Sequence, residues 1–259
     1  MKISDHRAAG PDEPAFVEEP VEMSLMEHLE ELRSRLFKIV FAYALCCVGA
    51  WYLYSRILAM LIEPLTRLPV ADQILREGQL IYTAPTEAFL IRLKVTAFTA
   101  MVFALPVILW QLWRFVTPGL HAHEKKYALP FVFVSLILFA LGVTVAFISL
   151  PKALEVLAGF AGTELVLLPR ASDYLSFVLI LIAAFGFSFE FPVILLGLTL
   201  VGVLSSAKLR SARRIAWVVI LVLAAVITPT QDPITLMIMA VPLGLLYEGT
   251  ILAARLMKR

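Results

Sequence analysis

Residues 127–150 read YALPFVFVSLILFALGVTVAFISL and contain no charged side chain. At about 1.5 Å per residue, a helix of this length reaches about 36 Å, which exceeds the ~30 Å hydrocarbon core of a bilayer. Pro130 falls in the first turn, where a helix tolerates proline. The stretch therefore predicts a membrane-spanning helix, and we interpret the other apolar runs of the chain as segments that also lie in lipid.

The composition of the whole chain agrees with this prediction. Hydrophobic residues make up 61% of the chain and charged residues 16%, against about 45–50% and about 25% in soluble domains. The apolar residues form further runs at 39–60, 95–113, 175–201, 215–227 and 234–246. We therefore predict an all-α, polytopic membrane protein with six transmembrane helices.

The last two apolar runs are short. Residues 215–227 and 234–246 each give about 20 Å of helix, less than the ~30 Å hydrocarbon core. They form either two short spans in a thinned bilayer or a hairpin that enters part-way, and six spans follow from the first reading.

The flanking segments divide the chain into three parts. Residues 1–22 are polar, acidic and proline-containing, which predicts a disordered tail. Residues 23–250 form the expected six-helix membrane domain, and residues 251–259 form a basic C-terminus. We expect Pro64 to end the first span, and Pro85 and Glu87 to open the second helix, because proline and acidic residues favour a helix N-terminus.

Basic residues predict the orientation. About two thirds of the Lys and Arg residues lie in the N-terminal tail, the second and fourth connections and the C-terminus, and positive charge stays in the cytoplasm. Both termini are therefore expected in the cytoplasm.

Glu190 is the most informative single residue of the spans. It lies near the centre of the fourth apolar run, where a charge costs about 2.5–3.5 kcal/mol. Pro192 follows it and removes one helical hydrogen bond. Glu190 is interpreted either as a polar site for a partner helix or a proton, or as a packing carboxyl that is bonded to a neighbouring helix.

Acidic residues also collect on the predicted cytoplasmic side. Glu27, Glu30 and Glu31 precede the first span, and Glu124 lies in the second connection. Carboxylates accept paired hydrogen bonds from guanidinium groups, so these residues suit a cationic peptide. The alternative is that they form pairs within one helix, such as Glu31 with Arg35.

Several other functions find no support in the sequence. A net charge of +2 gives no argument for nucleic acid. We find no zinc motif, no nucleophile elbow and no phosphate-binding loop. We therefore expect no enzymatic activity, no metal site and no cofactor, and we keep a proton-coupled small-solute transporter using Glu190 as the alternative function.

Four ordered motifs resemble those of TatC, the receptor subunit of the twin-arginine protein translocase. They are HLEELRSRL (28–36), LPVILWQLWRFVTPGL (105–120) with HEKK (123–126), YLSF (174–177) with FGFSFEFP (185–192), and Thr228-Pro229 with Asp232-Pro233 ahead of Pro242-Leu243 and Leu246-Tyr247-Glu248. They extend over most of the chain in the family's order.

The resemblance implies a cup-shaped receptor in the bacterial inner membrane that uses the proton-motive force. It implies binding of twin-arginine signal peptides on folded cargo, contact with TatA and/or TatB, and an oligomeric assembly in lipid. The implied signal-peptide residues are Glu31, Arg33, Arg35 and Glu124, and the implied partner-helix residue is Glu190. The implied structural or coupling residues are Pro64, Pro85, Glu87, Pro192, Pro229 and Asp232.

Overall fold

The computed structural model describes residues 25–67, 79–116, 128–159, 170–228 and 233–256, which are almost entirely helical. Four long helices carry most of the fold: α1 (Leu25–Thr66), α3 (Pro85–Val116), α4 (Ala128–Gly159) and α5 (Ala171–Leu200). Each has at least 30 residues, or at least about 45 Å of helix. The expected all-α membrane fold is confirmed.

Three further helices complete the described chain: α6 (Ser206–Ser211), α7 (Arg213–Ile227) and α8 (Pro233–Leu256). Among the described residues, five helices are long and apolar enough to cross a membrane, namely α1, α3, α4, α5 and α8. Helix α7, with 15 residues, is the short sixth one at about 22 Å. The six-helix prediction therefore agrees with the structure.

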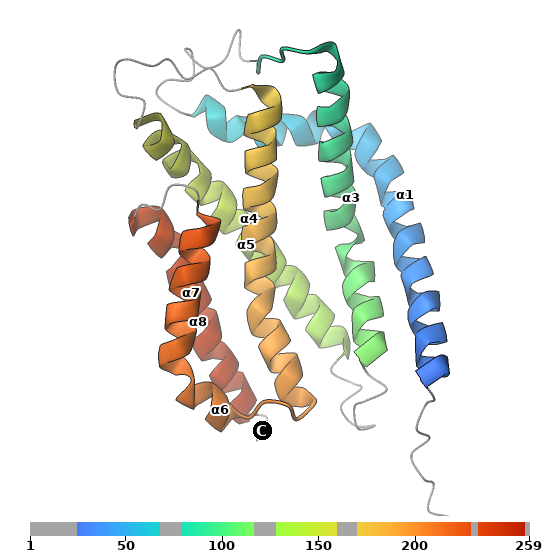
Figure 1. The fold of residues 1–259 in the computed structure, drawn as a ribbon, viewed down its shortest axis with the longest axis vertical. Helices are drawn as coiled ribbons and strands as arrows, with labels where there is room; N and C mark the ends of the chain where they lie inside the picture. Colours follow the sequence, from blue (N-terminus) through green and yellow to red (C-terminus); the bar gives the residue numbers. More distant parts are fainter. Residues whose placement is uncertain (1–24, 68–78, 117–127, 160–169, 229–232, 257–259) are drawn as a thin grey trace, which may run out of the picture.

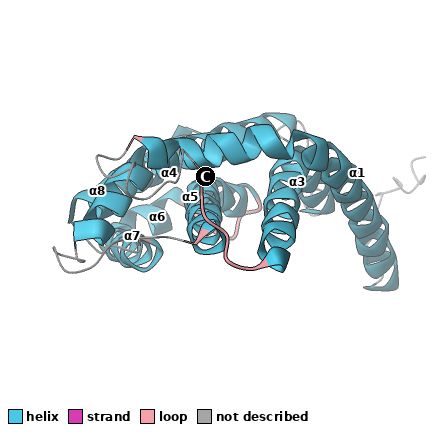
Figure 2. Ribbon diagram, turned by 90° about the horizontal axis from the view of Figure 1, so that it is seen from above, coloured by secondary structure: helices cyan, strands magenta, loops and turns pink. Residues whose placement is uncertain are grey.

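The helices form a curved row with α5 in its middle (Figures 1 and 2). Helices α1 and α3 pack together on one side, α7 and α8 on the other, and the tilted α4 packs on α5. The start of α1, the helix α6 and the end of α8 lie at one end of the bundle, here called the α6 end (Figure 1). The starts of α3 and α5 lie at the opposite end, here called the Pro85 end.

Helix α5 supplies most of the core, and α1 faces mainly outward. In the most apolar window of α5, 56% of the residues are buried, against 6% in that of α1. Phe185 and Phe189 of α5 are both fully buried. The last turns of α1, cyan in Figure 1, cross behind α3 and α5, where the Tyr174 hydroxyl donates to the Leu61 carbonyl at 2.8 Å.

Two glycines let α4 and α5 approach closely. A Cβ atom on Gly142 would lie 2.7 Å from the Phe185 carbonyl oxygen and 3.0 Å from Cγ of Phe189. A Cβ atom on Gly186 would lie 2.6 Å from the Phe139 ring. Small residues at such crossings allow membrane helices to pack backbone against backbone.

Three helix ends differ from the sequence-based expectation. Helix α1 continues past Pro64 to Thr66. The proline removes one helical hydrogen bond, and the Thr66 hydroxyl closes the following turn by donating to the Glu63 carbonyl at 2.7 Å. Helix α4 includes Pro151 and extends to Gly159, beyond the uncharged stretch 127–150 that predicted the span. Helix α8 has 24 residues, so the short apolar run 234–246 is only part of a longer helix.

Candidate functional site

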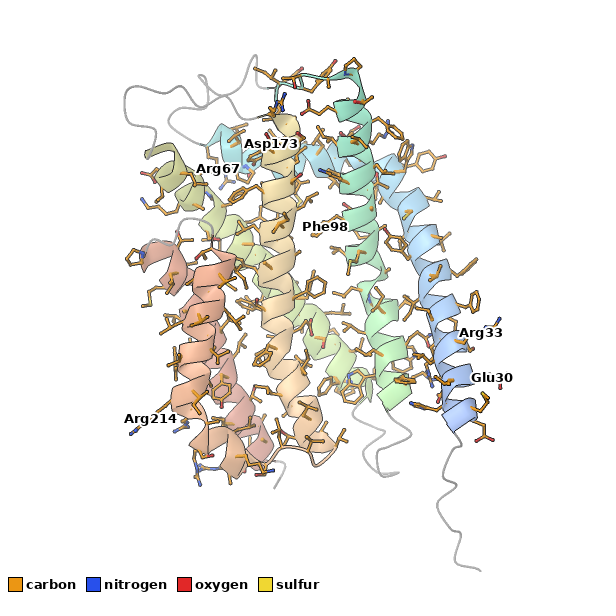
Figure 3. The ribbon with its side chains drawn as sticks, in the orientation of Figure 1. Glu30, Arg33, Arg67, Phe98, Asp173 and Arg214 are labelled. Atoms are coloured by element: carbon orange, nitrogen blue, oxygen red, sulfur yellow. The ribbon has the colours of Figure 1, made fainter. Side chains whose placement is uncertain are left out.

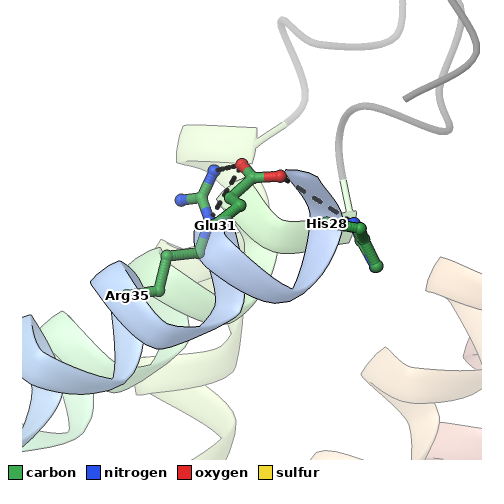
Figure 4. Close-up of polar contacts among 3 residues, drawn as sticks. All are labelled: His28, Glu31 and Arg35. Carbon is green, nitrogen blue, oxygen red and sulfur yellow. Dashed lines mark hydrogen bonds and ion pairs between the residues drawn. The ribbon is translucent and has the colours of Figure 1, made fainter. Parts of the chain in front are cut away.

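Glu31 is paired within its own helix at the α6 end. Arg35 donates from Nε to Oε1 of Glu31 at 3.1 Å, and its Nη2 contacts the same oxygen (Figure 4). His28 Nδ1 lies 3.9 Å from the other oxygen, Oε2. The i,i+4 pairing that the sequence allowed is therefore formed.

This pairing uses only half of the carboxylate. Oε2 of Glu31 is shielded from solvent and has no hydrogen-bond partner among the described residues. The Glu31 side chain is 22% exposed and the Arg35 side chain 13%. One shielded acceptor oxygen is therefore held in a fixed position without the hydrogen bond that such an atom normally has.

His28 joins this part of α1 to the end of α3. Its ring stacks on Phe115, with ring centroids 4.5 Å apart and planes 25° apart. Helix α3 ends at Val116, and the connection that contains Glu124 follows it. Glu124 lies outside the described residues, but the stacked rings bring Glu31 close to the point where its connection begins.

Arg33 is not brought together with Glu31 and Arg35. Its side chain and that of Glu30 point away from the bundle (Figure 3), and its guanidinium carbon lies 5.7 Å from the Phe37 ring centroid. Residues two positions apart face different sides of a helix, which accounts for the separation.

Glu190 borders an apolar cavity of about 220 Å³ between α3, α4 and α5. Only Ser135 and Glu190 contribute polar side chains to its lining, and Ser135 lies within hydrogen-bonding reach of the carboxyl group. The rest of the lining is Leu109, Leu112, Trp113, Phe131, Val193, Ile194, Gly197, Leu198 and Val201. Glu190 is 8% exposed, and its Oε1 has no hydrogen-bond partner in the described part of the chain.

Two aromatic rings and a glycine pack at the edge of this cavity. Trp113 and Phe131 meet edge to face, with centroids 4.0 Å apart, and Gly197 leaves room for Phe131. Pro192 lies buried inside α5. The Thr250 hydroxyl of α8 donates to the Leu246 carbonyl of its own helix at 2.9 Å and lies 3.4 Å from the Pro192 carbonyl oxygen. Helix α8 therefore packs against α5 close to Glu190.

Glu87 connects two helix starts at the Pro85 end. Its Oε2 accepts from the backbone N–H of Thr83 at 2.8 Å and of Ala84 at 3.4 Å. Its Oε1 accepts from the N–H of Ser172 in the first turn of α5 at 3.2 Å. One carboxylate therefore satisfies free N–H groups of both α3 and α5.

Two contacts extend beyond what the sequence indicated. The serine at position 135 is a hydroxyl within an uncharged span, and only the fold places it beside Glu190. Arg92 lies over the rings of Trp51 and Tyr54, at 4.2 and 5.1 Å from the centroids. The remaining predicted residues, Pro229 and Asp232, lie outside the described residues.

Comparison with known proteins assigns the family. The family model for "Sec-independent protein translocase protein (TatC)" matches residues 27–242. The chain belongs to the TatC family. The resemblance of its sequence motifs to TatC is thereby confirmed, and the family places the chain among multi-pass membrane proteins of protein transport.

Several relatives and solved structures support the TatC assignment. The Sec-independent protein translocase protein TatC of Aquifex aeolicus is 39% identical, over 92% of this chain and 97% of its own. The TatC protein of Frankia casuarinae is 42% identical, and the match covers 87% of this chain and 64% of the Frankia protein. A crystal structure of the twin-arginine translocase receptor TatC in DDM matches with a TM-score of 0.72 at 38% identity, covering 88% of this chain and 99% of that one. These relatives are named for transport and not for catalysis.

Proposed function

We propose that this chain is the membrane receptor of a twin-arginine protein translocase, and that it binds paired arginines of signal peptides on folded cargo. The observation that carries the proposal is the half-used carboxylate of Glu31. Its Oε1 is bonded to Arg35, and its Oε2 has no hydrogen-bond partner among the described residues. A guanidinium group supplies the fixed fork of N–H donors that such an oxygen lacks.

Glu124 is the proposed second carboxylate of this site. The contact between His28 and Phe115 supports the pairing, because it ties α1 to the end of α3 from which the connection continues. Two carboxylates suit two guanidinium groups. In this proposal Arg35 positions Glu31, and the outward-pointing Arg33 contacts the peptide or the lipid headgroups beside it.

The Glu190 cavity is the proposed docking site for a helix of TatA and/or TatB. The cavity is apolar apart from Ser135 and Glu190, and the carboxyl has an unused oxygen. A single apolar helix with one polar side chain complements both features.

Crosslinking tests this docking. A photo-crosslinker at Ile194, which lines the cavity, should capture a TatA or TatB helix and should lose it when Glu190→Ala is added. A crosslinker at the exposed Ile180 is the matched control. Crosslinks from Ile194 that persist unchanged in the Glu190→Ala variant reject the docking role.

The proposed orientation places the α6 end in the cytoplasm of a bacterial cell. The start of α1 and the end of α8 lie at the same end of the bundle (Figure 1), and the basic connections support the cytoplasmic side. A reporter enzyme that is active only outside the cytoplasm, fused after Arg259, should be silent. Activity of that fusion would overturn the orientation.

A proton-coupled solute transporter remains the alternative use of Glu190. The described residues that line its cavity include no second ionisable side chain, so the translocase proposal is the better supported. Substrate-dependent proton flux into liposomes that hold this chain alone would favour the transporter.

Export in cells tests the function as a whole. Deletion of the chain should abolish export of a folded reporter with a twin-arginine signal peptide, and the unaltered chain should restore it. The Glu31→Ala variant should restore export poorly, whereas Glu30→Ala, one residue away on the outward face, should restore it. Normal export in the deletion strain would end the proposal.

A further inference from the structure

Four exposed basic residues form a patch at the α6 end, here called the α6–α8 basic patch. They are Lys208 and Arg210 of α6, Arg214 of α7 and Arg255 of α8. None of the four has an ion pair within the described ranges, whereas the neighbouring Arg213 pairs with Glu248 at 2.6 Å. The patch therefore carries positive charge that the described residues leave unbalanced.

The fold holds this patch in place. Leu209, between the two basic residues of α6, is buried, and its carbonyl accepts from the Tyr247 hydroxyl of α8 at 2.8 Å. The Arg213–Glu248 pair ties the start of α7 to the same helix. Residues seven positions apart share a helix face, so Arg255 continues the face of Glu248 about 10 Å further along α8. Helix α8 ends at the α6 end (Figure 1).

Helix α7 brings the patch to the level of the lipid headgroups. Its 15 residues span about 22 Å, which is less than the ~30 Å hydrocarbon core. Arg214 lies in its first turn and points outward from the bundle (Figure 3). Headgroups at this end must therefore approach the first turn of α7 if its apolar side chains are to stay in hydrocarbon.

Two basic residues at the Pro85 end, Arg67 and Lys152, provide a contrast. Arg67 donates from Nε to Glu63 at 2.6 Å, and Lys152 lies 3.0 Å from Glu155. Their charges are balanced by carboxylates on the same helix. The orientation of a membrane protein requires only an excess of lysine and arginine on the cytoplasmic side. It does not require that four of these residues gather around α6 without ion pairs in the described part of the chain.

We propose that the α6–α8 basic patch binds the phosphate groups of anionic phospholipids and so anchors the bilayer surface at the short helix α7. The ammonium group of lysine and the guanidinium group of arginine both bind phosphate through charge-assisted hydrogen bonds. Clusters of four or more basic residues directly beside a membrane helix attract anionic lipid. The site lies apart from Glu31 and Glu190, so it stands independently of the proposed receptor function.

The test is the affinity of the purified full-length chain, in a neutral detergent, for phosphatidylglycerol, measured by native mass spectrometry. Basic residues contribute about fivefold each to binding of an anionic surface. Changing Lys208, Arg210, Arg214 and Arg255 together to Gln should therefore weaken binding about 600-fold. The matched control, Arg67→Gln with Lys152→Gln, should stay within about twofold of the unaltered chain.

Two further arms identify the ligand and exclude misfolding. Phosphatidylethanolamine should bind weakly, and inorganic phosphate should not displace the anionic lipid. A charge-keeping variant with Arg210→Lys, Arg214→Lys and Arg255→Lys should retain most of the binding. Undiminished binding by the Gln variant, equal binding of phosphatidylethanolamine, displacement by inorganic phosphate or loss of binding in the charge-keeping variant would each overturn the proposal.

Discussion

Adding one methyl group at Gly142 should force α4 and α5 apart. In the Gly142→Ala variant, Cβ would lie 2.7 Å from the Phe185 carbonyl oxygen and 3.1 Å from Cα of Gly186. Ordinary contacts of this kind begin at about 3.4 Å, and backbone atoms of a packed helix cannot rotate out of the way as side chains do. The two helices would have to separate by several tenths of an ångström.

The expected cost is that of overpacking, about 1–3 kcal/mol. For a chain of this size it corresponds to a fall in the melting temperature of about 2–10 °C. The assay is thermal unfolding of the purified chain in detergent at one fixed scan rate, because membrane proteins often unfold irreversibly.

Gly49 of α1 offers a matched control. Nothing lies within 4 Å of the position where its Cβ would be placed, and alanine is favoured over glycine in a helix by about 1 kcal/mol. Gly49→Ala should therefore leave the melting temperature unchanged or raise it. If Gly142→Ala melts at the same temperature as Gly49→Ala, the close packing of α4 on α5 is refuted.

Three further predictions concern other contacts of the fold. Glu87→Ala should lower the melting temperature and speed proteolysis at the Pro85 end, because three backbone N–H groups lose their acceptor; unchanged proteolysis would contradict its linking role. Tyr247→Phe should cost about 1 kcal/mol by removing the hydrogen bond to α6, whereas Tyr52→Phe at an exposed site should cost nothing in the same unfolding assay. Gly244→Ala would place its Cβ on the Trp217 ring. Because Trp217 is 37% exposed and a side chain, unlike packed backbone, can rotate, this variant should melt above Gly142→Ala, and the reverse order would contradict the reasoning.

The membrane fold could be predicted from the sequence because lipid imposes simple rules. Each long apolar run had to become a helix, since a spanning segment must satisfy its own backbone hydrogen bonds. The helix ends were less predictable. Helix α8 continues through the polar residues Glu248 and Thr250. Glu248 accepts from Arg213 of α7, and Thr250 donates to the Leu246 carbonyl of its own helix. The contact with Arg213 joins residues 35 positions apart and is not visible in the order of residues.

The candidate site could be predicted in part. The sequence singled out Glu190 because a carboxyl is costly in an apolar run, and the structure adds the cavity and Ser135 from another helix. For Glu31 the sequence left two readings, pairing with Arg35 or binding a cationic peptide. The structure forms the pair yet leaves one oxygen without a hydrogen-bond partner in its described part, a distinction that depends on side-chain geometry and not on spacing.

The affinity of the purified chain for a twin-arginine signal peptide tests the central claim most directly. A hydrogen bond to a charged group contributes about 1.5–3 kcal/mol, so Glu31→Ala and Glu124→Ala should each weaken binding about 10- to 150-fold. Glu30→Ala, whose side chain points away from the bundle, should bind as the unaltered chain does, and a twin-lysine peptide should bind weakly to all of them. Equal affinity of the unaltered chain, Glu31→Ala and Glu124→Ala for the twin-arginine peptide would contradict the account.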